Sequence, residues 1–303
     1  MVAEADGEHE LVAGNHRVVV VTAGGGLRAY QHGDRPVLDG YRAGARPDGG
    51  RGQLLAPWPN RLADGAYRFG GADYQCPITE PARHTAIHGL VRWEAWDTAE
   101  ADRRRVAMTL RLPAGPCYPS DLHLRVEYTL DPAAGLAVAM EATNVGGRPC
   151  PFGAGAHPYV TLGDPTIDRA TLRAPAATVL DTDGRGIPTG RRPVAGTAVD
   201  FRQGRPIGDA RIDTCLTDLH RDEDGLSRVV LSNARAAVTV WMDESFGFLM
   251  LYTGDALDDP GRRRQGLAVE PMTCAPDAFH NGYGLVVLEP DETFRGTWGI
   301  SPT

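Results

Sequence analysis

Short runs in which apolar and polar residues alternate make up most of this chain, and Gly, Pro, Asp and Asn separate one run from the next. The clearest runs cover residues 16–22, 106–112, 123–130, 136–143, 229–231, 237–242 and 248–253. Such alternation is typical of half-buried antiparallel strands. With 37 Gly and 23 Pro and no sustained apolar stripe of helical period, long helices are not expected. The sequence therefore predicts an all-β fold, a large antiparallel β-sandwich.

No fixed-period repeat and no low-complexity linker divides the chain, so we expect one domain over residues 1–303. The loosest stretch, residues 174–211, is rich in Pro, Gly, Asp and Arg, and we expect it to be an excursion over one face of the sheet. The AGGGLR segment at residues 23–28 lacks the GxGxxG spacing of a dinucleotide loop. We interpret it as the turn of a hairpin between two strands.

Charge and cysteine content exclude several classes of protein. The net charge of -8 argues against a general nucleic-acid surface, and no stretch approaches the ~20 apolar residues of a membrane span. The acidic start has no apolar core of a signal peptide. The five cysteines are scattered without a CxxC pair, which favours reduced thiols in the cytoplasm over a disulfide framework or a zinc site. Because the chain contains no Lys, Schiff-base chemistry and a P-loop are also excluded.

Ionisable residues interrupt apolar or turn-like surroundings in three segments. Glu270 follows an apolar strand, His157 follows four small residues, and His88 and the Asn60-Arg61 pair lie in the segment 52–96. A desolvated carboxylate gains a pKa suited to a general base, and histidine exchanges protons near neutral pH. Taken singly, each has an ordinary structural explanation, such as a core histidine or an arginine paired with a nearby acid like Asp64.

The order of the motifs is more specific than any one of them. NRLADGAYRFGGADY, AIHGLVRW, CYPSDLHLRVEYTL, GAGAHPYV, IDTCLTDL and GLAVEPMTCAPDAF follow one another along the chain. In this order they resemble the aldose 1-epimerase, or galactose mutarotase-like, family over about residues 52–300. The resemblance implies a large antiparallel β-sandwich that binds a monosaccharide. It also implies interconversion of sugar anomers by acid/base ring opening and closing, with no metal and no organic cofactor.

The resemblance also implies roles for individual residues. Glu270 in LAVEP matches the general base and His157 in AHPY matches the general acid, so changing either would cripple turnover. The remaining matches are to substrate-binding positions. They comprise Asn60 and Arg61 in the NR motif, His88 in IHG, and Asp213, with Asp218 near enough for the alignment to slip to it.

Two positions depart from the family pattern. Thr85 stands where Asn is common, and Cys117 replaces the Gly that commonly precedes Tyr-Pro. Both changes are expected to alter the rim of the pocket and leave the acid/base pair untouched.

Other functions compete with this interpretation. A metal site is the least favoured, although four residues offer suitable ligands, namely His84, His88, His157 and Glu270. A glycosidase would pair Asp213 with Glu270, and a non-catalytic sugar-binding module would not need the acid/base pair.

Two further alternatives keep every motif. A sugar-6-phosphate 1-epimerase would add arginines for the phosphate, with Arg92 as one candidate. A natural-product enzyme would use the same pair for dehydration, isomerisation or cyclisation of a carbonyl compound that is not a sugar.

Overall fold

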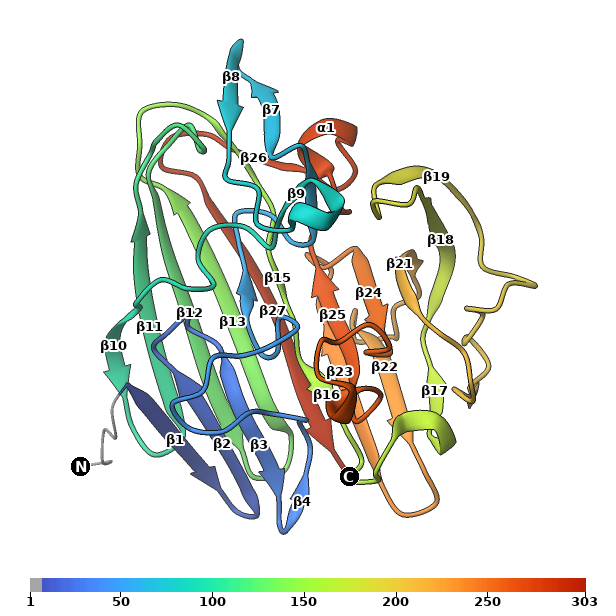
Figure 1. Ribbon diagram of the computed structural model, residues 1–303. Coiled ribbons are helices and arrows are strands. Elements are labelled where there is room, and N and C mark those ends of the chain that lie inside the picture. Colours follow the sequence, from blue (N-terminus) through green and yellow to red (C-terminus); the bar gives the residue numbers. More distant parts are fainter. Residues whose placement is uncertain (1–6) are drawn as a thin grey trace.

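Two large antiparallel sheets form most of the structure, a computed structural model that describes residues 7–303 (Figure 1). Side chains on the long strands alternate between buried and exposed positions, as the sequence pattern predicts. The one α-helix among the described residues, α1 (Ala278–Asn281), is a single turn. The predicted all-β antiparallel fold is confirmed.

The first sheet has nine strands and runs from β10 on the left of Figure 1 to β17 at the lower right. Its spatial order is β10 (Asp97–Ala101), β11 (Arg105–Leu112), β12 (Leu122–Asp131), β13 (Gly135–Asn144), β27 (Thr293–Pro302), β23 (Ala237–Met242), β22 (Ser227–Ser232), β17 (Thr171–Arg173) and β20 (Arg205–Pro206). The last long strand of the chain therefore joins the two halves of this sheet.

The second sheet carries the residues of most functional interest. Its order is β19 (Pro188–Pro193), β18 (Ala176–Thr182), β21 (Asp213–Leu219), β24 (Phe248–Tyr252), β25 (Leu267–Met272), β15 (Gly155–Ala156) and β5 (Leu54–Leu55), with β16 (Tyr159–Val160) also paired to β25. All six residues of β25 are buried. A strand covered on both faces has one face in the core and the other beneath loops, and here that second face carries Glu270.

Smaller sheets complete the fold. A four-stranded sheet contains β1 (Glu8–Ala13), β2 (His16–Val21), β3 (Leu27–His32) and β4 (Arg35–Pro36). Three two-stranded sheets pair β6 (Arg61–Ala63) with β9 (Thr85–Ile87), β7 (Ala66–Phe69) with β8 (Ala72–Gln75), and β14 (Cys150–Phe152) with β26 (Val286–Leu288). The AGGGLR segment joins β2 to β3, which are paired antiparallel, so the predicted hairpin is confirmed.

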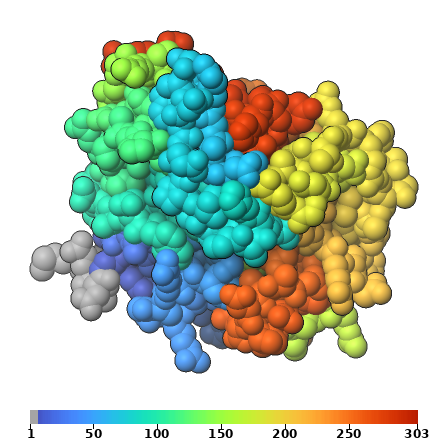
Figure 2. Space-filling view, turned by 45° about the horizontal axis from the view of Figure 1, so that its top comes forward, coloured from blue at the N-terminus to red at the C-terminus, as the bar shows by residue number. Residues whose placement is uncertain are grey.

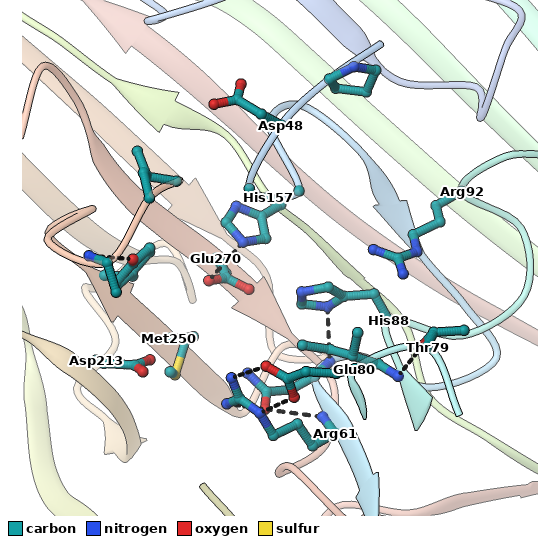
Figure 3. Close-up of a pocket in the computed structure, with 18 of the residues that line it drawn as sticks. Asp48, Arg61, Thr79, Glu80, His88, Arg92, His157, Asp213, Met250 and Glu270 are labelled. Carbon is teal, nitrogen blue, oxygen red and sulfur yellow. Dashed lines mark hydrogen bonds and ion pairs between the residues drawn. The ribbon is translucent and has the colours of Figure 1, made fainter. Parts of the chain in front are cut away.

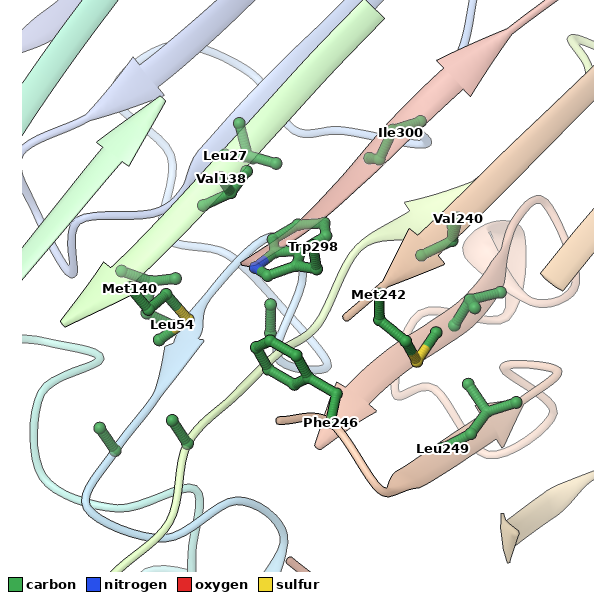
Figure 4. Close-up of a cluster of buried hydrophobic side chains, with 14 of the residues drawn as sticks. Leu27, Leu54, Val138, Met140, Val240, Met242, Phe246, Leu249, Trp298 and Ile300 are labelled. Carbon is green, nitrogen blue, oxygen red and sulfur yellow. The ribbon is translucent and has the colours of Figure 1, made fainter. Parts of the chain in front are cut away.

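The main core lies between the two large sheets and draws side chains from Leu11 to Ile300. Trp298 on β27 is among the largest buried side chains, and Figure 4 shows it amid residues from several strands. Val240 and Leu249 come from opposite sheets and belong to the same cluster. This continuity of the core fits the expectation of one domain, which stays a prediction.

Two predictions are wrong. Residues 174–211 are not an excursion over a sheet face, because β18 and β19 form the edge of the second sheet and β20 the edge of the first. The cysteines are not all free thiols either: Cys76 and Cys117 form a disulfide, and Cys150, Cys215 and Cys274 are buried and free. The fold brings the β7–β8 hairpin against the 113–121 loop and so joins cysteines 41 residues apart.

The disulfide removes the cysteine argument for a cytoplasmic location, which remains a prediction. No helix among residues 7–303 combines the length and apolar character that crossing a bilayer requires.

Candidate active site

Strand register brings His157 and Glu270 together. Gly155 pairs with Met272 and Tyr159 pairs with Ala268 on the same strand, β25. The residues midway between these two pairings are His157 and Glu270. Two motifs more than a hundred residues apart in sequence therefore face each other across neighbouring strands.

The two side chains form a buried pair, with His157 Nε2 3.3 Å from Glu270 Oε1 (Figure 3). His157 is 4 % exposed and Glu270 2 %. Their other polar atoms, His157 Nδ1 and Glu270 Oε2, are buried without a hydrogen-bond partner among residues 7–303. An unsatisfied buried polar group is costly, so its presence in a concave site points to a ligand that supplies the missing partner.

Electrostatics favour the uncharged form of each partner. Burial raises the pKa of Glu270 well above its usual value; the charge of Asp213 adds to this shift, and Arg61 opposes it. Burial lowers the pKa of His157 to about 3, and Arg51 is among the cations that add to the effect. Over the range between these two pKa values the pair holds one proton, and moving it from the carboxyl to the imidazole leaves the net charge unchanged.

Tyr159 and the loop at Gly50 both contact the His157 ring closely. It stacks on Tyr159, with ring centroids 5.1 Å apart and planes 14° apart, and the Tyr159 hydroxyl donates to the Gly49 carbonyl at 3.0 Å. The loop backbone at Gly50 covers the ring so closely that a Cβ there would lie 2.6 Å from His157 Cδ2. Gly50 has a φ of +79°, which a residue with a side chain adopts at a cost. This glycine thus lets the loop approach the imidazole.

His88 and Asn60 hold each other in place. Both lie in the left-handed region, with φ of 65° and 57°. The His88 amide donates to the Asn60 carbonyl at 2.8 Å, and the Asn60 amide donates to His88 Nδ1 at 3.2 Å. Burial and the nearby His157 lower the pKa of His88 well below its usual value. His88 is therefore neutral with its proton on Nε2, where it can donate to a ligand. Backbone strain of this kind concentrates at functional sites.

Arg61 is held by Glu80, not by the nearby Asp64 that the sequence offered as its structural partner. Arg61 Nε and Nη2 donate to Glu80 at 2.7 and 3.0 Å, and the Thr85 hydroxyl donates to the same carboxylate at 2.7 Å. Asp64 pairs instead with Arg185 at 2.8 Å. Sequence reasoning missed Glu80, because nothing in its surroundings distinguishes it from other loop acids.

These side chains line one cavity of about 630 Å³. It lies where loops near residues 48, 90 and 258 meet, coloured blue, teal and orange on the surface (Figure 2). All six residues that the sequence singled out line it, namely Asn60, Arg61, His88, His157, Asp213 and Glu270. Asp218, Cys117 and Thr85 are not among its lining residues, although the Thr85 hydroxyl donates to the lining residue Glu80. Of the two aspartates, only Asp213 lines the cavity, and its role in binding substrate stays a prediction.

Three of the lining residues also form a possible ligand set for a metal. Donor atoms of His88, His157 and Glu270 all lie within 4.8 Å of one another. Two imidazoles and a carboxylate suit zinc. His84 does not join them, since its Nδ1 lies 2.9 Å from Asp64 Oδ1 on the surface.

Comparison with known proteins identifies the family of this chain. The aldose 1-epimerase family model matches residues 8–301. An uncharacterised Escherichia coli protein, YihR, is 33% identical over 285 residues, covering 94% of this chain and 90% of that protein. Mouse galactose mutarotase is 30% identical over 276 residues, covering 81% of this chain and 77% of the mouse protein.

Solved structures share the fold. A galactose 1-epimerase from Lactobacillus acidophilus superposes with a TM-score of 0.82 at 23% identity, covering 99% of this chain and 92% of that one. An aldose epimerase homologue from C. elegans gives a TM-score of 0.88 at 18% identity, covering 99% of both chains. The chain belongs to the aldose 1-epimerase family.

Proposed function

We propose that this protein is an aldose 1-epimerase, which interconverts the α and β anomers of a monosaccharide with Glu270 as general base and His157 as general acid. The observation that supports this most directly is the buried His157–Glu270 pair, 3.3 Å apart in a cavity lined by hydrogen-bonding side chains. Such a lining suits a polyol better than an apolar natural product, and about 630 Å³ is ample for a sugar.

The reaction needs one group to accept a proton and another to supply one. Glu270 removes the proton of the anomeric hydroxyl, the bond from the anomeric carbon to the ring oxygen breaks, and His157 protonates that oxygen. The product is the open-chain aldehyde. After rotation about the adjacent carbon–carbon bond, the same steps run in reverse and close the ring on the other face.

Glu270 and His157 hold one proton between them, which explains how a protonated carboxyl and a neutral imidazole can act as base and acid. Transfer from the Glu270 carboxyl to His157 creates the carboxylate and the imidazolium together, without bringing net charge into the buried site. Sugar hydroxyls then supply partners for the atoms that burial leaves unsatisfied, His157 Nδ1 and Glu270 Oε2. Each positioned proton-transfer group typically contributes about 10²–10⁴-fold to the rate.

The other lining residues would hold the sugar. Two hydrogen bonds to Glu80 already order the Arg61 side chain. Its remaining N–H groups can therefore bind the sugar with little further loss of side-chain conformational entropy. His88 donates from Nε2, and Asp213 accepts from hydroxyls. A metal on His88, His157 and Glu270 would occupy the lone pairs that this mechanism uses, so the proposal includes no metal.

The experiment is polarimetry on freshly dissolved single anomers of neutral and anionic aldoses, with the uncatalysed rate in the same buffer as reference. At least one aldose should equilibrate more than about tenfold faster with micromolar enzyme. If the folded protein accelerates none of them, the aldose 1-epimerase proposal is wrong, and a substrate that is not a sugar becomes the better hypothesis.

A further inference from the structure

Arg92 brings a cation into the cavity without an acidic partner. Of the three arginines that line the cavity, Arg61 is paired with Glu80, and Arg83 lies 3.6 Å from Glu80 and 3.9 Å from Asp213. Arg92 has no carboxylate within 4.0 Å in the described part of the chain, and its side chain donates no hydrogen bond there. It is nevertheless partly shielded from solvent.

A second arginine reinforces this charge. Arg46 Cζ lies 3.9 Å from the ring centroid of Trp93, and Arg92 Cζ lies 5.4 Å from the same centroid. Arg46 likewise has no ion pair among residues 7–303. Burial and then the neighbouring Arg46 lower the pKa of Arg92. Two like charges are thus held together on one aromatic ring beside a cavity, which is unfavourable unless an anion joins them.

None of the acidic residues that line the cavity forms an ion pair with this arginine pair, Arg46 and Arg92. Asp48 is held by Arg51 at 2.6 Å, and Glu80 is engaged by Arg61. In Figure 3, Arg92 lies on the opposite side of the acid/base pair from Asp213. The chain as a whole has a net charge of -8, so an unpaired cationic site in its main cavity is not a consequence of overall composition.

We propose that the cavity takes a monosaccharide bearing an oxyanion substituent away from the anomeric carbon, and that Arg92, backed by Arg46, binds this group. The proposal rests on the proposed function, since it assumes that the anomeric centre lies against Glu270 and His157. Guanidinium groups bind phosphate, sulfur oxyanions and carboxylates through charge-assisted hydrogen bonds. All three substituents are oxyanions, which defines the substrate class. The experiment below shows which of them is preferred.

The test compares kcat/KM for glucose, glucose 6-phosphate, glucose 6-sulfate and glucuronate, measured by NMR exchange between anomers. For wild type, at least one anionic sugar should exceed glucose by about 10- to 100-fold. Arg92→Gln should reduce kcat/KM for that sugar at least tenfold more than for glucose, mainly through KM. Arg46→Gln should act in the same direction with a smaller effect, about two- to fivefold.

Arg104→Gln is the matched control, because Arg104 is exposed at the β10–β11 turn, outside the lining of the cavity. It should leave every rate unchanged. If glucose is interconverted and no anionic sugar is preferred, or if Arg92→Gln reduces all four substrates equally, the oxyanion site is refuted while the epimerase proposal stands. If none of the four sugars is interconverted, the oxyanion site is also refuted, and the wider polarimetry panel then decides whether the proposed function itself fails.

Discussion

Replacing Gly50 by alanine tests how finely the imidazole of His157 is positioned. The new Cβ would lie 2.6 Å from His157 Cδ2 and 2.9 Å from Nε2, whereas ordinary contacts begin near 3.4 Å. The ring must therefore move by roughly 1 Å, or the loop must withdraw by as much. A displacement of that size in a catalytic group costs about 10²-fold in rate. The positive φ of residue 50 adds a stability cost of about 1–2 kcal/mol.

The assay is kcat for anomer interconversion together with thermal unfolding. Gly33→Ala is the control, because Gly33 also has a positive φ of 60° but a Cβ there would meet no atom within 4 Å. Both variants should lose the stability that a positive φ costs, and only Gly50→Ala should also lose about two orders of magnitude in kcat. If Gly50→Ala kept kcat within twofold of wild type, the claim that this ring must stay where the loop holds it would be refuted.

Three further outcomes follow from the structure. Because burial raises the pKa of Glu270, the folded state keeps a proton that the unfolded chain releases above about pH 4.5. Stability should therefore fall as pH rises from there through the folded pKa, and Glu270→Gln should flatten that slope in denaturant titrations at several pH values; an unchanged slope would contradict the shift. Reducing the Cys76–Cys117 disulfide, which spans 41 residues, should lower the free energy of unfolding by about 3–4 kcal/mol, and identical melts with and without reductant would argue against it. Asp213→Asn should raise KM while Asp218→Asn on the same strand should not, and equal effects would remove Asp213 from the binding site.

Much of the fold follows from local pattern. The alternation in residues 122–131 and 135–144 appears in the structure as β12 and β13, and the turn at residues 23–28 as a hairpin. What the pattern could not predict depends on contacts distant in sequence. The Cys76–Cys117 pairing requires the β7–β8 hairpin to reach the 113–121 loop. The edge strands in residues 174–211 are too polar and too rich in Gly and Pro to stand out as strands.

The site residues likewise fall into those that motifs predict and those that depend on contacts distant in sequence. The motif order predicts the six site residues, and the register of β15 and β16 against β25 explains why His157 and Glu270 meet. Glu80 and Arg46 lie outside every motif, whereas Arg92 belongs to AIHGLVRW and the sequence already offered it as a candidate for binding a phosphate. Glu80 matters because β6 and β9 bring Arg61 beside it, and Arg46 matters because its loop folds over Trp93. Such roles arise from spatial proximity, which the sequence alone did not reveal.

The central claim is that Glu270 and His157 exchange the protons of ring opening. It is tested most directly by NMR exchange rates between anomers of the best aldose, comparing wild type with Glu270→Gln and with Glu141→Gln, a partly exposed control on β13 outside the lining of the cavity. The account predicts a loss of at least about 10³-fold in kcat for Glu270→Gln, with native circular dichroism and retained sugar binding, and no change for Glu141→Gln. A Glu270→Gln rate within tenfold of wild type would contradict the claim.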